Sequence, residues 1–461
     1  MDAKAIRKLQ PQLDKYLNEF ADCFPRRDSR EHFPRYVSGQ LSNLPRKSVE
    51  PIALKTGVPP RTLQQFLSSY RWDDQGMVDR LQQLVVRDHA SHHAIGIIDE
   101  TSFVKKGEHT PGVQRQHCGT VGKIENCIVT VHLGYAAADF HCLLDGDLFL
   151  PESWSQDRDR CRAAGIPEDV VYRPKSEIAL ELSDRARANG VTFEWMTFDE
   201  WYGAKPAFLR GLEQRGQKYV AEVPQTFVVW IDTPRVTDRP YRRGGRGRGR
   251  QLPRLVAGSE RPQAVRDVLQ NHPALRDQPW VRYHVKDTEK GPEVWEAKHV
   301  LVNLPDERGL PSEPHHLVIA RNVLHSDVLK FFIAAAPLDT PTTTLLLVAF
   351  SRWRIERLFE DDKGEVGLDH YEGRCWTGLK RHLALSAVSY YFLAEVVQAS
   401  REKKSGADRM PGASRRGGAG PIVVAAPGRA KAAAGTGRQR DRPLATQKPQ
   451  RPPLPHPHEM A

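Results

Sequence analysis

Hydrophobic residues recur at helical spacing through most of the first ninety positions of the chain. The pattern is clear in Ile6–Phe20 and returns in Met77–Val86, so we predict amphipathic helices over both segments. Between them, Ser48 can cap a short helix, Gly57 can end it, and a second helix can begin near Pro60. This outline fits a helix-turn-helix, and an ordinary helical hairpin fits it equally well.

From residue 91 the pattern changes to short apolar runs rich in β-branched and aromatic residues. Three strands are predicted first, over His93–Ile98, Cys127–Tyr135 and Phe140–Leu150, and helical patterns follow them. A second strand-rich stretch runs from residue 219 to about residue 302 and contains KYVAEV, TFVVWID, WVRYHV and EVWEAKHVLVNL. Beyond it, Ser351–Lys363 and Leu379–Ala399 are strongly helical.

These changes of pattern divide the chain into five parts and predict an α/β fold. The parts are a helical N-terminal region (1–90), the first part of an α/β core (91–215), a mainly β insertion subdomain (216–340), the C-terminal part of the core (341–400) and a tail (401–461). The tail consists largely of Ala, Gly, Pro and Arg with almost no aromatic residues, so we expect it to be disordered.

Composition limits the class of protein. At 461 residues with 39% hydrophobic content, the chain can form two or three domains with a sizeable core. Its six cysteines form no C-x-x-C pair and no His/Cys cluster at zinc-ligand spacing, so neither a zinc module nor a disulfide framework is indicated. The most apolar run, Thr343–Phe350, is far too short to span a bilayer. We therefore expect a cytoplasmic protein with no membrane partner.

The net charge of +11 is only weak support for a nucleic-acid partner, because most of it lies in the tail. Residues 401–461 hold thirteen Lys and Arg against four Asp and Glu, so nine of the eleven net positive charges lie in the tail. A basic tail is often a solvated extension. The Arg/Gly-rich run Tyr241–Arg250 is a better candidate, because arginines among glycines can follow a phosphate backbone, although a solvated loop is the competing interpretation.

Two aspartates occupy corresponding places at the ends of apolar strands. Asp99 follows the run Ile95–Ile98, and Asp199 follows Phe193–Phe198 before a turn that leads to a helix near residue 206. Each could simply cap a turn. If the two strand ends are neighbours in one sheet, both carboxylates point into the same crevice, where α/β sheets bind ligands. Glu100 adjoins Asp99, but consecutive side chains of a strand face opposite ways, so only one can enter the site.

A third acidic candidate lies on the helix predicted over residues 351–363. Positions i, i+4, i+7 and i+11 share one face of a helix, and here they hold Arg352, Glu356, Phe359 and Lys363. A salt-bridged surface helix explains this pattern without any function. Glu360 lies one turn after Glu356 on the same face and is the alternative third carboxylate.

Taken together, these motifs resemble a known group of enzymes. The segment RWRIE with its following lysine resembles the Y-x2-R-x3-E-x6-K pattern of IS4-like DDE transposases, where Arg352, Glu356 and Lys363 fit and Ala349 replaces the tyrosine. The ordered set IIDET with KKG, FDEWYG and RWRIERLFEDDKGEVGLDHYEGR most resembles the IS701 family of bacterial insertion-sequence transposases. The resemblance covers roughly residues 30–400.

This resemblance implies a fold, a chemistry and a set of residues. The fold is an RNase H-like core with a β-rich insertion, and the DDE triad is Asp99, Asp199 and Glu356, which would hold two Mg²⁺ ions, or Mn²⁺ in their place. Asp99 would bridge both ions. The substrate is double-stranded DNA, comprising terminal inverted repeats and a target, bound by a homodimer or higher multimer on the bacterial nucleoid. The expected DNA-contacting residues are Arg352, Lys363, Arg61, Arg243, Arg246 and Arg248.

Two other functions share part of this pattern. An RNase H-like nuclease would have the same metal site without strand transfer, but the helical N-terminal region and the long insertion favour a transposase. A transposase-derived DNA-binding protein that no longer cuts is the other alternative, and the presence of all three carboxylates argues against it.

Overall fold

The computed structural model describes residues 3–239, 252–288 and 291–407. The Arg/Gly-rich run with Arg243, Arg246 and Arg248 lies outside these residues, as does the chain beyond Ala407. All described residues belong to one compact unit of the chain.

The first ninety described positions are helical, as the hydrophobic pattern predicts. The elements are α1 (Ala3–Asn18), a 3-10 turn (Ala21–Cys23), α2 (Arg27–Gln40), α3 (Val49–Thr56), α4 (Pro60–Ser68) and α5 (Asp74–His89). Gly57 ends α3 in the left-handed conformation at φ +70°, which glycine adopts without strain, and α4 begins at Pro60. The Asp73 side chain caps α5 by accepting from the Gly76 amide at 2.8 Å.

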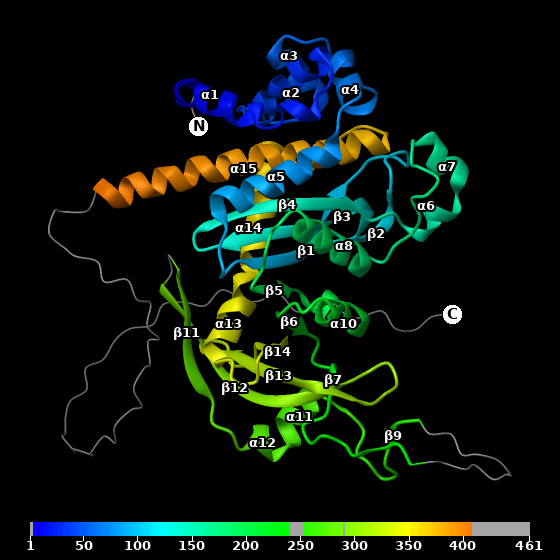
Figure 1. Cartoon of the computed structure of the whole chain (residues 1–461), viewed down its shortest axis with the longest axis vertical. Helices are drawn as coiled ribbons and strands as arrows, with labels where there is room; N and C mark the ends of the chain where they lie inside the picture. The colour runs from blue at the N-terminus through cyan, green and yellow to red at the C-terminus, as the bar shows by residue number, and fades with distance from the viewer. Residues whose placement is uncertain (1–2, 240–251, 289–290, 408–461) are drawn as a thin grey trace, which may run out of the picture. The chain divides into compact units, whose positions relative to one another are not determined.

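A ten-stranded mixed sheet runs through the rest of the structure (Figure 1). Along the sheet the order is β11-β12-β13-β14-β6-β5-β1-β3-β2, and β4 also pairs with β3. Strand β1 is parallel to β5, and β5 is parallel to β6. The strands are β1 (Ile95–Val104), β2 (Gln114–Cys118), β3 (Lys123–Ala137), β4 (Phe140–Leu148), β5 (Trp195–Phe198), β6 (Tyr219–Val223), β11 (Val281–Thr288), β12 (Gly291–Pro305), β13 (Pro311–Asn322) and β14 (Leu329–Ala335).

Shorter elements connect these strands. The helices are α6 (Glu152–Gln156), α7 (Arg158–Ala163), α8 (Lys175–Ala188), α9 (Glu200–Gly203), α10 (Pro206–Gln214), α11 (Val265–Asn271), α12 (Pro273–Arg276), α13 (Thr342–Ser351), α14 (Trp353–Asp361), a π-helical turn (Asp362–Val366) and α15 (Trp376–Ala407). The short strands are β7 (Val228–Val229), β8 (Val236–Thr237), β9 (Arg254–Leu255) and β10 (Gln263–Ala264).

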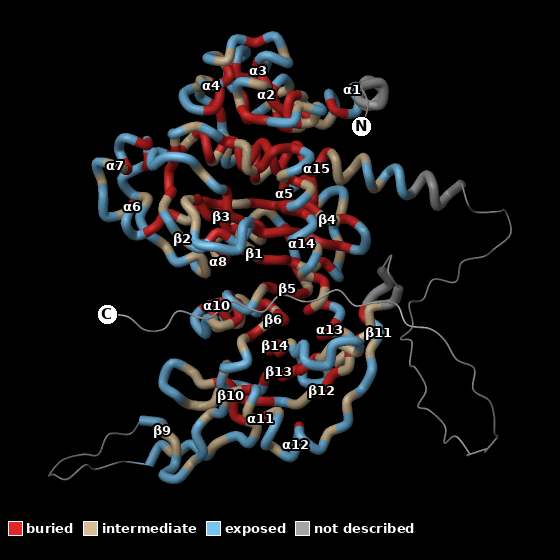
Figure 2. Tube along the Cα trace, turned by 180° about the vertical axis from the view of Figure 1, so that it is seen from behind, coloured by how far each residue is buried: buried red, intermediate tan, exposed pale blue. Residues whose placement is uncertain are grey.

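Helix α15 is the central element of the core. In Figure 1 it lies between the N-terminal helices and the sheet, and Figure 2 shows its N-terminal half buried. The Tyr16 hydroxyl donates to the Val388 carbonyl at 2.8 Å, and Gln40 donates to Ser386 at 3.0 Å. By length and composition α15 could cross a membrane, with a mean hydropathy of 1.2, but 56% of that window is buried inside the protein. Its apolar character is that of a core helix.

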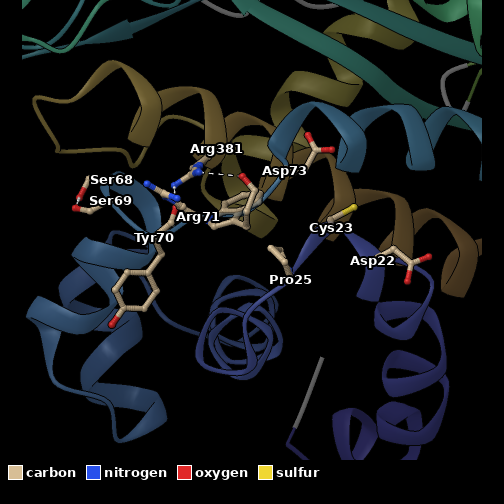
Figure 3. Close-up of a pocket in the computed structure, with 10 residues that line it drawn as sticks. Asp22, Cys23, Pro25, Ser68, Ser69, Tyr70, Arg71, Asp73 and Arg381 are labelled. Carbon is tan, nitrogen blue, oxygen red and sulfur yellow. Dashed lines mark hydrogen bonds between the residues drawn. The ribbon is translucent and has the colours of Figure 1, made fainter.

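One arginine of α15 attaches the N-terminal helices to the core. Arg381 has only 7% of its side chain exposed, and its guanidinium donates to the carbonyls of Leu67 at 3.0 Å, Tyr70 at 2.8 Å and Trp72 at 3.0 Å. It also lies over the Trp72 ring at 4.5 Å. Figure 3 shows this arginine beside the loop that follows α4. These carbonyls come at and after the end of α4, where helix carbonyls lack partners within the helix, so Arg381 completes their hydrogen bonding.

Candidate active site

Asp99 and Asp199 lie at the same level of two neighbouring parallel strands. The register of β1 and β5 pairs Ile98 with Phe198, and each aspartate is the next residue. Strand β1 extends beyond the predicted end at Ile98, because it continues its pairing with β3 as far as Val104. Asp99 is therefore inside a strand, and only the parallel pairing with β5 ends before it.

Burial raises the pKa of both aspartates, and the charge of Asp199 adds to the increase at Asp99. Only 13% of the Asp99 side chain is exposed, and burial together with the charge of Asp199 raises the pKa of Asp99 to about 7. The Arg352 guanidinium and the Glu100 amide, which donates to Asp99 Oδ1 at 2.8 Å, oppose this increase. Burial also raises the pKa of Asp199. The pair is thus a concentration of negative charge that a cation would stabilise.

Local hydrogen bonding fixes the backbone around Asp199. Its side chain caps α9 by accepting from the Tyr202 amide at 3.2 Å. Tyr202 is fully buried, and its hydroxyl has no hydrogen-bond partner among the described residues. Burial, with the charges of Glu100, Asp99 and Asp199, raises the pKa of Tyr202 well above its usual value. Sequence reasoning did not single out this tyrosine, although it lies in the FDEWYG motif.

The contact between α9 and β6 depends on a glycine. A Cβ atom at Gly203 would lie 1.9 Å from the carbonyl oxygen of Glu222, which is too close for any side chain. We expect Gly203→Ala to push α9 away from β6 and to lower the free energy of unfolding by about 1–3 kcal/mol, measured by urea denaturation. Gly119→Ala is the matched control, because a Cβ there meets nothing within 4 Å. Equal stability of the two variants would contradict this account.

The helix carrying Glu356 differs in form from the prediction. The expected helix over residues 351–363 is divided, since α13 ends at Ser351, α14 covers residues 353–361 and the following turn is π-helical. Single π-helical turns occur frequently at functional sites. The division leaves Arg352 at the junction of α13 and α14, with 21% of its side chain exposed.

Arg352 connects Glu356 to the aspartates. Its guanidinium lies 3.2 Å from Asp99 Oδ2 and 2.9 Å from Glu356 Oε1. In this structure the arginine therefore points into the carboxylate cluster. Glu356 itself has 56% of its side chain exposed and reaches the aspartates through the guanidinium.

Two alternative carboxylates have other partners. Glu100 forms an ion pair with Lys175 of α8 at 2.6 Å, so it is already neutralised. Glu360 is 73% exposed and lies 3.7 Å from Arg357 on its own helix, with no contact to Arg352. Glu356 is thus the acidic residue of α14 that Arg352 connects to Asp99.

A further carboxylate, Glu222 of β6, was not anticipated from the sequence. Its Oε2 lies 3.9 Å from Arg352 Nε, and its Oε1 lies 2.6 Å from Lys330 of β14. The sequence signal was the acidic residue inside the apolar run KYVAEV. Neither its strand neighbours nor its arginine partner can be read from that run, because both come from distant parts of the chain.

The remaining predicted DNA contacts lie in two places. The Lys363 ammonium donates to Thr120 Oγ1 at 3.0 Å, and burial lowers the pKa of this lysine. Arg61 is exposed on α4 and lines a cleft of about 710 Å³ together with Gln64, Arg162 and Arg374. Within the described part of the chain, Arg61 and Arg374 form no ion pair or hydrogen bond. These two arginines are therefore available to an anionic partner.

The carboxylates are not yet arranged as a complete metal site. Among the described residues, no group of three His, Cys, Asp or Glu side chains lies close enough to hold an ion. Asp99 and Asp199 are together, whereas Glu356 is separated from them by the Arg352 guanidinium. Their oxygen donors suit hard divalent cations.

The family model that matches the chain is that of the DDE superfamily endonucleases, over residues 19–292, which is more than half of the 461 residues. The chain belongs to the DDE superfamily of endonucleases. The matched residues include Asp99 and Asp199, and Glu356 lies beyond them. Enzymes of this superfamily use divalent metal ions.

A curated relative agrees with this assignment. The chain is 29% identical over 223 residues to the probable transposase for insertion sequence element IS701 of Microchaete diplosiphon. The aligned residues make up 48% of this chain and 55% of the relative, so the chain spans about half the length of the relative that it matches. The resemblance to IS701-family DDE transposases, predicted from the motifs, is confirmed.

Proposed function

We propose that this chain is a DNA transposase that cleaves the ends of a mobile DNA element and joins them to a target. The observation that carries the proposal is the placement of Asp99 and Asp199 at one level of adjacent parallel strands, linked by Arg352 to Glu356. The family match and the description of the relative as a probable transposase support it. The sheet also supports an RNase H-like core, because β5 and β6 add parallel to β1 opposite the antiparallel β3 and β4.

The three carboxylates would serve as ligands of two Mg²⁺ ions, for which Mn²⁺ can substitute. Asp99 would contribute to both, and Asp199 and Glu356 to one each. Bound ions would activate the attacking oxygen and stabilise the charge that develops on the phosphate. The donors fit, because all are oxygens and the buried pair Asp99–Asp199 carries repulsion that a cation relieves. Glu356 joins the pair only when its ion pair with Arg352 opens.

Protein residues outside the carboxylates would hold the DNA. Arg352 and Lys363 would contact phosphates after exchanging their present partners, and contacts of this kind position DNA without reading its sequence. Helix α4, as the second helix of a proposed helix-turn-helix, would present Arg61 and Gln64 to a duplex in the cleft that it shares with Arg374. We propose that a dimer or higher multimer assembles on paired ends in the bacterial cytoplasm.

Cleavage of cognate DNA tests the proposed function. The protein is incubated with Mg²⁺ and a duplex that carries the terminal repeats flanking its gene, and the products are resolved by length. We expect nicks at the repeat ends and, with a target plasmid present, joined products. Asp99→Asn should give neither. Cleavage that persists in this variant would reject the site, and cleavage without joining would identify a nuclease.

The cleft between α4 and the segment before α15 gives a separate prediction about DNA affinity. Arg61→Ala with Arg374→Ala removes its two unpaired arginines, so we expect weaker binding to every duplex and a salt dependence shallower by about two charges. Binding is measured by fluorescence anisotropy at several salt concentrations. Lys55→Ala is the control, because this lysine lies on α3 and does not line the cleft. An equal loss in the control would count against the cleft.

A further inference from the structure

Glu222 occupies the same level of the sheet as the two catalytic aspartates. Strand β6 continues the parallel set, with Ala221 paired to Phe198 of β5, so Glu222 follows its strand pair as Asp199 and Asp99 follow theirs. Residues in register on neighbouring strands point to the same face of a sheet. Three adjacent parallel strands therefore bring three carboxylates to one side, and the proposed triad accounts for only two of them.

The Arg352 guanidinium lies among carboxylates from three elements. It pairs with Asp99 of β1 at 3.2 Å and with Glu356 of α14 at 2.9 Å, while Glu222 of β6 is 3.9 Å away. The side chain of Glu222 is 17% exposed, and its second oxygen is held by Lys330 at 2.6 Å. Lys330 thus holds one oxygen of Glu222, and the other lies 3.9 Å from the arginine, beyond direct hydrogen-bond distance but within ion-pair range.

A divalent cation and the guanidinium compete for the same oxygens. Asp99 Oδ2 and Glu356 Oε1 are the atoms that Arg352 now contacts, and both residues would be ligands in the proposed function. Arg352 must therefore leave Asp99 when a cation arrives. A largely buried arginine without a carboxylate partner is strongly destabilising, because its charge is desolvated without compensation. Arg352 therefore needs another carboxylate within reach.

Resting on the proposed function, we infer that Glu222 is a positioning residue that receives the Arg352 guanidinium when a divalent cation displaces it from Asp99. In the metal-free protein, Arg352 replaces the cation as the counter-charge of the cluster. Glu222 lowers the free energy needed to move the guanidinium away from Asp99, and it keeps the arginine beside the reacting phosphate. Its contribution to metal affinity therefore depends on Arg352.

Metal binding without DNA tests this inference separately from catalysis. MnCl₂ is titrated into the full chain, and free Mn²⁺ is measured by electron paramagnetic resonance for wild type, Arg352→Gln, Glu222→Gln and the double variant. We expect Arg352→Gln to bind Mn²⁺ about tenfold more tightly and Glu222→Gln about tenfold more weakly, as for other residues that support metal ligands. In the Arg352→Gln background, Glu222→Gln should have no effect. Glu296→Gln is the control, because Glu296, like Glu222, pairs with two cationic side chains, here Arg282 of β11 and Arg321 of β13.

The possible results distinguish failure of the role inferred for Glu222 from failure of the proposed metal site. Unchanged affinity in Arg352→Gln would overturn the competition, and a loss from Glu222→Gln that persists in the double variant would overturn the role of Glu222 as a partner for the arginine. Mn²⁺ binding that survives unchanged in Asp99→Asn, or no binding by any variant, would reject the proposed metal site itself.

Discussion

Asp99→Asn is expected to make the metal-free protein more stable while reducing DNA cleavage at least about a thousandfold, as for loss of several kcal/mol of metal-assisted catalysis. The activity is lost because an amide is a poor ligand for a hard cation. The stability rises because the variant removes a buried charge that faces Asp199. Asparagine keeps the size of the side chain and an oxygen for the Arg352 guanidinium, which is 3.2 Å from Asp99.

The pH dependence of this stabilisation follows from the pKa of Asp99, which lies at about 7 in the folded protein against 3.8 for an ordinary aspartate. A carboxyl whose pKa is raised by folding stabilises the folded state at low pH, and this contribution is lost as the pH rises toward 7. The difference between these two pKa values corresponds to a change of about 4 kcal/mol in the free energy of unfolding. Between pH 5 and pH 8, the advantage of the variant over wild type should therefore grow by about 2–3 kcal/mol.

Urea denaturation of both proteins at the two pH values measures this effect. Asp147→Asn is a control of opposite sign, because Asp147 is also buried, yet Lys380 at 3.0 Å and Arg173 at 3.1 Å hold its pKa below the usual range despite its burial. Its removal leaves Lys380 without its carboxylate and Arg173 with only Glu181, and should destabilise the protein. A variant at Asp99 that is less stable than wild type at pH 8 would contradict the account of the site as a concentration of negative charge.

Arg381→Ala should lower the free energy of unfolding by about 3–5 kcal/mol, the range for breaking a buried charged network. The Arg381 side chain is only 7% exposed and bonds the carbonyls of Leu67, Tyr70 and Trp72, which would lose this partner in the variant (Figure 3). Arg381→Lys should be intermediate, since one ammonium cannot replace the planar fork that reaches all three. Urea denaturation gives the free energies.

Hydrogen exchange locates the damage from Arg381→Ala. Amides of α4 and of the first turn of α5 should exchange faster in this variant, because Arg381 also pairs with Asp74 of α5 at 3.3 Å. Amides of β3 should change less. Arg374→Ala is the matched control, since Arg374 is exposed a few residues before α15 and forms no hydrogen bond among the described residues. If both variants unfold at the same urea concentration, Arg381 does not attach the helices to the core.

Hydrophobic periodicity located the elements whose partners are local. The helices over α1 and α5, the turn at Gly57 and the start of α4 at Pro60 were predicted, because caps and turns depend on adjacent residues. Strand boundaries were less accurate, since they depend on pairing with distant segments. The run TFVVWID forms only the two-residue β7 with an isolated bridge at Trp230, and β13 and β14 extend the strand-rich stretch to Ala335 rather than to about residue 302.

The site was predictable to the extent that its residues follow a motif. Asp99 and Asp199 come at the ends of apolar runs, and the structure places them side by side, as expected for neighbouring strands. The direction of the Arg352 side chain could not be predicted, because helical spacing is compatible with an arginine facing DNA or facing Asp99. Glu222 was missed for a related reason, since only the parallel pairing of β5 and β6 brings it to the level of the aspartates.

Strand β14 pairs with β6 along Tyr219–Val223, so the strands β11–β14 belong to the same sheet as the aspartate-bearing strands. This continuity restricts how the protein can be shortened. Removing the segment between β6 and α13 would leave β6 as an unpaired edge, and exposed strand edges recruit other chains into aggregates. A truncated enzyme would also lose Lys330 from the carboxylate of Glu222. Engineering of a smaller protein from this scaffold would have to retain β14, or cover the edge of β6 with another strand.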